Sequence, residues 1–546
     1  MSTSEKVSGR LRAKLERANT IVATAWARGT AQPWFRPRLL ADIGLLGVLT
    51  IIHSIFGRSF LYAATKFDEQ FFLFEGFSLG KGLVPYRDFQ ELKPPAIFVV
   101  NMLALKIFGL DGMRYRHFFA LLTLAAYLSV AIALLSRRVP RLLILILVAL
   151  MISHSYDHGL IEGSIDTVET FGLDFFLLAV GTLLLKTRWV EAQQIAGGVL
   201  LALAPLTKEP FVIPTLVAWL SLLALYQTEA GAPRAWWLFA RRTATGALAL
   251  GLVWLIYMLV TRSLGSYLTQ LKQILTYSAD HNVMYGVFPK LSFAGTLAEF
   301  WRRLAKKYVN APHLVLFVPF FLSALLLWRR RGLLLAASVL ATFLAGLYGV
   351  TIGRGFFGHY FLIAMTGTFY WATLGAIALG ERFPEVAAPW RRWVVATLAL
   401  LVLSSLGPRL EQDWDAWGSA RPQPQPVPEA VVRVVKARTA PNDRIWNIGT
   451  PILYVVSDRL NGSSIPFMHD SILHLYAGAT DAERLAPYRR ELDRTLPKLV
   501  LMSTTGAACA CDRYMRGLVL PFLHDHKYRE VRDPAIPTIA LYERPN

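Results

Sequence analysis

Three short groups of ionisable residues, close together in the sequence, are the clearest sign of chemistry in this chain. They follow the first long apolar segment and read Phe67-Asp68-Glu69, Tyr86-Arg87-Asp88-Phe89 and Lys93-Pro94-Pro95. Charges gathered at one face of a membrane are costly unless they act on a charged substrate. This stretch is therefore the predicted reaction centre, and it favours an enzyme over a transporter.

Asp68 and Glu69 are adjacent, so on a helix their side chains point in different directions and can hold different roles. A carboxylate at the mouth of a wet cavity can take the proton of an acceptor hydroxyl while that oxygen attacks a sugar carbon and a phosphate leaves from the other side. One base is enough, because a phosphate leaving group needs little acid assistance. We predict Asp68 as the base and Glu69 as a group that orients the acceptor or the base. The alternative is that both acids only cap or solvate a helix end.

A departing phosphate needs positive charge, and four basic residues stand in segments predicted to face outward: Arg87, Lys93, Lys208 and Arg354. A guanidinium group suits bidentate contact with phosphate, whereas an ammonium group acts as a point charge. In the run Arg354-Gly-Phe-Phe-Gly-His359-Tyr360, the last two residues can add neutral donors to a phosphate oxygen. The alternatives are that Lys208 snorkels to the interface and that His359 is a structural group at the start of a span.

A second acidic segment carries four carboxylates and two histidines within a short reach. They are Asp157, Glu162, Asp166 and Glu169 with His154 and His158. Glu169 opens an apolar span and is the strongest candidate, whereas a solvated loop explains Asp157 and Asp166 equally well. The spacing matches no fixed metal-ligand pattern, and sites built from oxygen ligands leave weak marks in a sequence. The predicted chemistry requires no cofactor, and a divalent metal ion is a minority alternative.

Membrane helices must position these residues. The chain has 546 residues, 54% of them hydrophobic, and a mean hydropathy of +0.41, which is too apolar for a soluble multidomain protein. Its net charge of +20 does not indicate nucleic acid, because much of the Lys and Arg lies between apolar runs and sets orientation in the bilayer. Cys509 and Cys511 are too few for a disulfide framework or a four-ligand zinc site.

About eleven segments are predicted to cross the bilayer as helices, some of them short. They lie near residues 39–58, 115–135, 141–155, 168–186, 192–207, 210–227, 242–260, 311–328, 332–352, 357–379 and 392–407. A cytoplasmic N-terminus places the arginine-rich connections between them inside, as the positive-inside rule requires. Residues 1–38 then form a basic cytoplasmic extension, and 39–407 form the membrane domain.

The run 96–109 is apolar, but Asn101 and Lys106 interrupt it. Counting it as a span would place the later arginine clusters outside, so we expect a helix that lies on the outer surface. Phenylalanines recur at helical spacing over 67–77 and predict a second short surface helix, closed by Gly80 and Gly82. Together the two helices are expected to form a platform that roofs a cavity.

The last part of the chain is polar and has a different pattern. Residues 408–428 include a proline-rich stretch and are predicted to be a linker. Over 429–546, strand-like runs at 444–448, 498–502 and 538–542 alternate with helix-like runs at 429–438, 481–494 and 512–526. This alternation predicts a small α/β domain, which the topology places on the outer, extracytoplasmic face.

The stretch from Phe67-Asp68-Glu69 through Tyr86-Arg87-Asp88 to Lys93-Pro94-Pro95 resembles the first outer loop of the GT-C glycosyltransferases. Among them it is most similar to the bacterial group around the protein O-mannosyltransferases and the aminoarabinose transferase of lipid A. The resemblance covers the whole chain, including the topology, the acidic second outer loop and the terminal α/β domain. It implies a GT-C fold, a polyprenyl-phosphate sugar as donor and Asp68 as the base or acceptor-positioning group. It also places Lys208 and the Arg354 segment near the donor phosphate.

Residues and resemblance together predict an inverting glycosyltransferase of the bacterial inner membrane. It would move a sugar from a polyprenyl-phosphate donor to a lipid, glycan or protein acceptor at the outer face. The predicted catalytic residues are Asp68, Glu69 and Glu169, and the predicted substrate-binding residues are Tyr86, Arg87, Asp88, Lys93, Asp157, Glu162, Lys208, Arg354, His359 and Tyr360. Two rival hypotheses are a transporter or flippase of polyprenyl-linked sugars, whose charges would lie nearer the middle of the membrane, and a non-catalytic protein that binds lipid-linked sugar.

Overall fold

The computed structural model of the chain describes residues 35–61, 67–91, 93–110, 114–156, 166–230, 234–272, 293–304, 317–324, 332–352, 358–382, 427–465, 481–503 and 515–545. The chain divides into two compact units, Met1–Ile52 and His53–Asn546. The described part of the first unit is the beginning of helix α2 (Phe35–Leu61), where Leu40, Ile43 and Ile51 are exposed. Such an apolar surface is suited to lipid contact.

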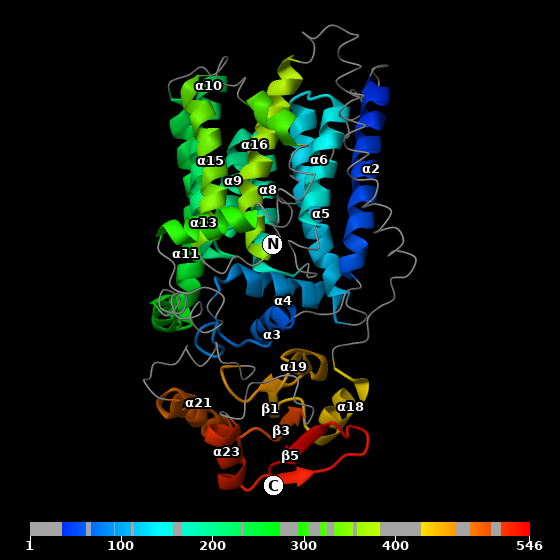
Figure 1. The fold of residues 1–546 in the computed structure, drawn as a ribbon, viewed down its shortest axis with the longest axis vertical. Coiled ribbons are helices and arrows are strands. Elements are labelled where there is room, and N and C mark those ends of the chain that lie inside the picture. Colours follow the sequence, from blue (N-terminus) through cyan, green and yellow to red (C-terminus); the bar gives the residue numbers. More distant parts are fainter. Residues whose placement is uncertain are drawn as a thin grey trace, which may run out of the picture. The chain divides into compact units, whose positions relative to one another are not determined.

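The second unit contains the other helices of the membrane domain (Figure 1). They are α5 (Tyr115–Ser136), α6 (Arg141–Ser155), α8 (Val168–Leu184), α9 (Val190–Leu203), α10 (Val212–Ala230), α11 (Ala235–Val260), α13 (Phe293–Leu304), α15 (Leu333–Ile352) and α16 (Phe361–Arg382). Within the described residues, six segments are long and apolar enough to cross a membrane, namely those in α2, α5, α10, α11, α15 and α16. The expected span at 392–407, and much of that at 311–328, lies outside the described residues, so the number eleven stays a prediction.

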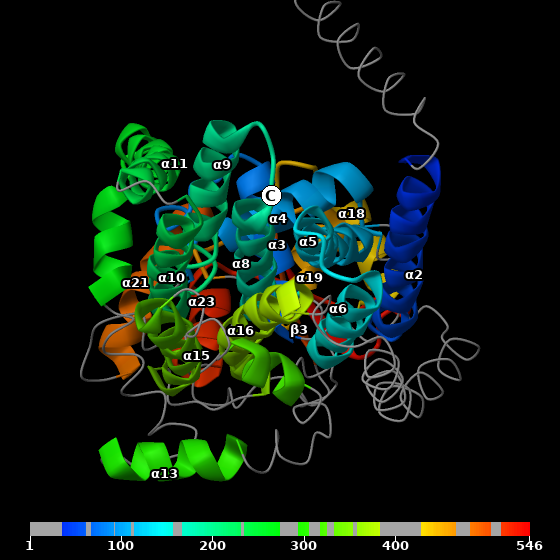
Figure 2. The ribbon, with the colours of Figure 1, turned by 90° about the horizontal axis from the view of Figure 1, so that it is seen from above.

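Small residues let these helices approach closely. In Figure 2, α9 lies beside α11 and α15 lies beside α16. A Cβ atom at Gly198 of α9 would overlap the carbonyl of Thr243 on α11, and one at Gly246 of α11 would overlap the carbonyl of Ile195. Glycine at such crossings allows backbone packing where no hydrophobic effect drives helices together. α16 is almost wholly buried, so it belongs to the centre of this helical packing.

Helices α3 (Phe67–Gly80) and α4 (Ala96–Phe108) form where the two surface helices were expected. They pack against each other, and a side chain at Gly76 would collide with the backbone of Asn101. α4 has 13 residues, fewer than the roughly 20 that a helical span needs. Its length is therefore that of a surface helix. Between α3 and α4, the chain turns through Gly82, whose φ of 86° favours glycine.

Residues 427–545 contain a five-stranded sheet of order β2-β1-β3-β5-β4. Its strands are β1 (Arg444–Ile448), β2 (Leu460–Asn461), β3 (Leu499–Ser503), β4 (Arg529–Val531) and β5 (Ile539–Glu543). β1 runs parallel to β2 and β3, whereas β5 runs antiparallel to β3 and β4. The accompanying helices are α18 (Glu429–Arg438), α19 (Ile452–Ser457), α21 (Asp481–Thr495) and α23 (Leu520–Asp525), with a π-helix at Met515–Val519. Trp446, Tyr488 and Phe522 fill the core.

Several contacts join this α/β domain to the first predicted outer loop. The amide of Gln90 donates to the carbonyl of Ser464 at 2.9 Å, and Lys81 pairs with Asp458 at 2.7 Å. The hydroxyl of Thr450 donates to the side chain of Gln70 on α3. The α/β domain therefore supports the loop that carries the predicted reaction centre.

Candidate active site

Asp68 lies in the first turn of α3 with its side chain exposed. Among the described residues it has no hydrogen-bond or ion-pair partner, although its charge acts on buried Asp166, just before α8. A carboxylate at a helix N-terminus is stabilised by the helix dipole. Asp68 is thus an accessible carboxylate, as a proton acceptor must be.

Glu69, the next residue, accepts hydrogen bonds at both of its carboxylate oxygens. Arg116 on α5 donates to both of its oxygens at 2.6 and 2.7 Å, and the hydroxyl of Tyr115 donates to Oε1 at 2.8 Å. Both members of the ion pair are buried, and Arg116 also donates to the carbonyls of Phe60 and Leu61. The Glu69 carboxylate therefore fastens α3 to α5 and to the end of α2. Because both Glu69 oxygens already accept hydrogen bonds, this residue is suited to fixing the position of Asp68.

The segment Tyr86-Arg87-Asp88 closes the turn between α3 and α4. Arg87 donates twice to Asp88 at 2.8 Å and once to the carbonyl of Thr261 at 2.9 Å. Asp88 also accepts from the amide of Val84, and although burial opposes it, these hydrogen bonds hold the pKa of Asp88 below its ordinary value. Arg87 and Asp88 neutralise each other, so their contacts build the loop.

Tyr86 belongs to the same loop and is buried. Its hydroxyl donates to the carbonyl of Lys93 at 2.9 Å, and its ring contacts that of Tyr267 with centroids 4.9 Å apart. Its carbonyl accepts from Gln270, and its φ of 66° is unusual for a residue other than glycine. Tyr86 therefore fixes the backbone at Lys93.

Four of the predicted residues meet at one point. Lys208, in the turn between α9 and α10, forms a buried ion pair with Glu169 in the first turn of α8. His359 Nε2 lies 3.9 Å from Glu169 Oε1, and Lys208 Nζ lies 3.4 Å from the ring centroid of Tyr360. These four side chains, the lysine cluster, come from three segments of the chain. Cation–π contact and ion pairing together keep a charged ammonium group in a buried place.

The lysine cluster adjoins the first outer loop. The amide of Ala96 donates to the carbonyl of Leu206 at 2.9 Å, which ties the start of α4 to the turn that carries Lys208. Lys93, Lys208 and Glu91 all lie close enough to Glu209 to act on its charge. The sequence-predicted residues Lys93 and Lys208 therefore lie in one electrostatic neighbourhood.

Between Asp68 and the lysines lie two buried acids. Asp166 accepts from Asn101 at 3.3 Å, and Glu75 of α3 is completely buried near Glu91, Lys93 and Asp166. Burial, followed by the charge of Glu91, raises the pKa of Glu75 well above its ordinary value, although Lys93 opposes the shift. Burial and the charge of Glu69 likewise raise the pKa of Asp166. Both environments therefore favour the protonated form of the acid.

We expect Glu75→Gln to flatten the pH dependence of stability. Because the folded pKa of Glu75 is raised, the folded chain binds more protons than the unfolded chain above the ordinary value of 4.5, and stability falls as pH rises through that window. Unfolding measured at pH 5 and pH 8 should show a larger loss for the wild type than for the variant. Glu429→Gln, at an exposed glutamate, is the control that keeps the wild-type profile. Parallel profiles for Glu75→Gln and the wild type would contradict a raised pKa of Glu75 in the folded chain.

Three predicted residues, Asp157, Glu162 and Arg354, lie outside the described residues, as does His158. Within the described part of the chain, no group of three or more His, Cys, Asp or Glu side chains is arranged to hold a metal ion. A bound divalent metal ion therefore remains a minority alternative that rests on the sequence alone.

Sequence reasoning missed several residues that the fold brings into this region. Arg116 and Tyr115 hold Glu69, while Glu75 and Glu91 surround Lys93. Asp174, inside the apolar run of α8, accepts from Thr123 at 2.7 Å. A signal existed for Asp174, because an acid within a predicted span is a functional candidate by itself. No sequence signal linked Glu69 to Arg116, since only the fold shows which charges meet.

Comparison with known proteins found solved structures of similar fold but no matching sequence family. No protein-family model and no curated protein matches the chain. Among solved structures, the archaeal oligosaccharyltransferase AglB from Archaeoglobus fulgidus, in complex with an inhibitory peptide and a dolichol-phosphate, matches with a TM-score of 0.50 and 13% identity, over 94% of this chain and 75% of AglB. ArnT from Cupriavidus metallidurans, bound to undecaprenyl phosphate, gives a TM-score of 0.46 and 14% identity, over 92% of this chain and 97% of ArnT.

At such low identities, the similarity to AglB concerns the fold. This shared fold agrees with the resemblance seen in the first outer loop, because AglB is a GT-C enzyme. The chain therefore shares its fold with the archaeal oligosaccharyltransferase AglB.

Proposed function

We propose that this protein is an inverting glycosyltransferase that takes its sugar from a polyprenyl-phosphate donor at the outer face of a bacterial inner membrane. The observation that carries the proposal is the arrangement around α3: an exposed carboxylate, Asp68, stands at its start, and two lysines, half-buried Lys93 and buried Lys208, share one neighbourhood beyond it. The fold shared with AglB supports it, because that protein was solved with a dolichol-phosphate.

In the proposed reaction, the acceptor hydroxyl gives its proton to the Asp68 carboxylate as its oxygen bonds to the anomeric carbon. The bond from that carbon to the phosphate oxygen breaks, and polyprenyl phosphate leaves with the bonding electron pair. Lys93 and Lys208 stabilise the charge on the leaving phosphate, since positive groups in a dry site are most effective where charge develops. Arg354 is assigned the same role from the sequence.

Glu169 has a defined task in this scheme. It pairs with Lys208 and, with the Tyr360 ring, holds the lysine side chain in place before the donor arrives. His359, beside Glu169, can donate to a phosphate oxygen. When the phosphate binds, Lys208 exchanges part of its contact with Glu169 for contact with the donor.

Lys208→Met should weaken donor binding about 10- to 100-fold, because a hydrogen bond to a charged group is worth about 1.5–3 kcal/mol. Titration with a non-hydrolysable polyprenyl-phosphonate sugar would measure the affinity. Glu169→Gln is the matched variant, since it breaks the same ion pair and leaves the lysine free to bind. Equal losses in the two variants would mean that Lys208 serves only the ion pair.

The activity test uses the purified full-length protein with a labelled polyprenyl-phosphate sugar and a cell-envelope extract as the source of acceptors. A glycosyltransferase releases polyprenyl phosphate and forms a labelled product. A flippase in proteoliposomes would move the intact donor across the bilayer, and a non-catalytic binder would do neither. Absence of both released polyprenyl phosphate and labelled product would refute the proposal.

A further inference from the structure

A cavity of about 630 Å³ lies between the end of α2, the end of α4 and the beginning of α5. Its volume is in the range of sites for small molecules, about 300–1,000 Å³. None of the residues that line it belongs to the reaction centre described above. The cavity therefore calls for a ligand of its own.

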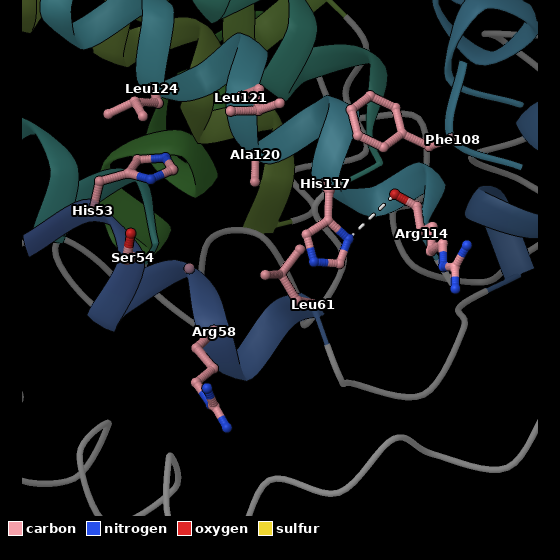
Figure 3. Close-up of a pocket in the computed structure, with 11 residues that line it drawn as sticks. His53, Ser54, Arg58, Leu61, Phe108, Arg114, His117, Ala120, Leu121 and Leu124 are labelled. Atoms are coloured by element: carbon pink, nitrogen blue, oxygen red, sulfur yellow. Dashed lines mark hydrogen bonds between the residues drawn. The ribbon is translucent and has the colours of Figure 1, made fainter. Parts of the chain in front are cut away.

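The cavity has a basic end and an apolar side (Figure 3). Arg58 comes from the last turn of α2, and Arg114 and His117 come from the turn before α5 and its first turn. The Nδ1 atom of His117 lies 3.2 Å from the carbonyl oxygen of Arg114, which fixes the ring at this end. Leu121 and Leu124 continue along α5 at spacings of four and seven from His117, so the three share one helix face.

In the orientation proposed above, α5 enters the bilayer from the outer side. Arg58 and Arg114 then stand at the outer headgroup level, where the positive-inside rule gives no reason for basic residues. Leu121, which is 53% exposed, and Leu124 lie deeper, at the level of the acyl chains. A ligand that fits must carry negative charge at one end and hydrocarbon at the other.

We propose that this cavity binds an outer-leaflet lipid through a phosphate in its headgroup. Arg58 and Arg114 approach from different helices and can each form charge-assisted hydrogen bonds with phosphate oxygens. The lipid chains lie along Leu121 and Leu124. This site is separate from that of the donor phosphate, and only its level in the bilayer rests on the proposed function.

The cavity is also connected to the reaction centre through α5. Arg116 stands between Arg114 and His117 in the sequence and grips Glu69, the neighbour of Asp68. A lipid held at Arg114 therefore lies against the same helix turn that positions the proposed base. Because Arg114 directly precedes α5 and Arg116 lies in its first turn, the bound lipid would lie near the end of α3 that carries Asp68.

Photo-crosslinking can test the site with the full-length protein in maltoside micelles, which contain no other phosphate. The probe is phosphatidic acid with a photoreactive group at the end of one acyl chain, and the reference is diacylglycerol with the same chains. We expect phosphatidic acid to label the peptide that contains Leu121 and Leu124 about tenfold more than diacylglycerol does. Equal labelling by the two probes would show an apolar groove with no phosphate site.

Variants of the basic end sharpen the test. Arg58→Gln/Arg114→Gln should lower labelling by phosphatidic acid at least tenfold, a factor that one lost charge-assisted contact accounts for. Lys106→Gln/Lys272→Gln removes two exposed charges that do not line the cavity and should leave labelling unchanged. Arg114→Gln alone, at an exposed side chain, keeps the test decisive if the double variant folds poorly.

Three further results would overturn the inference: equal labelling of the two double variants, undiminished labelling of Arg114→Gln, or displacement of the lipid probe by millimolar inorganic phosphate. Measurement of donor affinity distinguishes a failure of this lipid site from a failure of the proposed function. It should stay at the wild-type value in Arg58→Gln/Arg114→Gln, whereas Lys208→Met should lower it without affecting lipid labelling.

Discussion

Asp68→Asn is expected to lower the rate of sugar transfer by about 10²- to 10⁴-fold, the contribution typical of a general base. The amide keeps the size and most hydrogen-bonding capacity of the carboxylate but cannot accept the hydroxyl proton. Because Asp68 is exposed and has no hydrogen-bond or ion-pair partner among the described residues, its replacement should leave the fold intact. The measurement is single-turnover transfer from a labelled donor, with donor affinity determined in parallel.

Asp458→Asn provides the control, because Asp458 is a half-exposed acid in a left-handed conformation that asparagine also adopts. Transfer should be unchanged in this variant. Donor affinity in Asp68→Asn should equal that of the wild type, since the carboxylate acts on the acceptor. A normal transfer rate in Asp68→Asn would exclude it as the base, and a loss of donor affinity equal to the loss of rate would assign it to donor binding.

Breaking the pair between Glu69 and Arg116 is expected to produce the largest loss of stability. Both side chains are buried, and their hydrogen bonds are 2.6 and 2.7 Å long. Removing one partner leaves an uncompensated charge away from water, which costs about 3–5 kcal/mol. Glu69→Gln and Arg116→Met should each lower the free energy of unfolding by this amount, measured by SDS-induced unfolding in mixed micelles.

The double variant Glu69→Gln/Arg116→Met should recover part of this loss, because no unpaired charge remains. Lys81→Met is the matched control, since it breaks a half-exposed ion pair worth at most about 1 kcal/mol. If Glu69→Gln were as stable as Lys81→Met, the buried pair would not be the link between α3 and α5. Additive losses in the double variant would also contradict the pairing.

The fold was largely predictable from local patterns. Expected spans at 115–135 and 141–155 coincide closely with α5 and α6, because long apolar runs bounded by charges have few other conformations. The start of α11 was predicted seven residues late, since Arg241 and Arg242 lie within a helix that begins at Ala235. Hydropathy locates the apolar part of a helix, whereas hydrogen bonding carries the helix past the membrane boundary.

The candidate site was predictable in its residue types and less so in their pairing. Glu169, Lys208, His359 and Tyr360 were predicted separately, and the fold brings them into one cluster. Arg87 and Asp88 contact each other and the backbone, and their role in substrate binding stays a prediction. A sequence shows which side chains carry charge but not which lone pairs are already occupied.

The amino-acid sequence by itself determined that this chain is helical and apolar, that α3 begins with two acids and that lysines follow in later turns. These features depend on local hydropathy and on spacing within one helix. Only the tertiary structure decided that Glu69 is clamped by Arg116 while Asp68 is exposed, and that Lys208 meets Glu169. Such contacts join residues 39 and 47 positions apart, and their geometry depends on how whole helices pack.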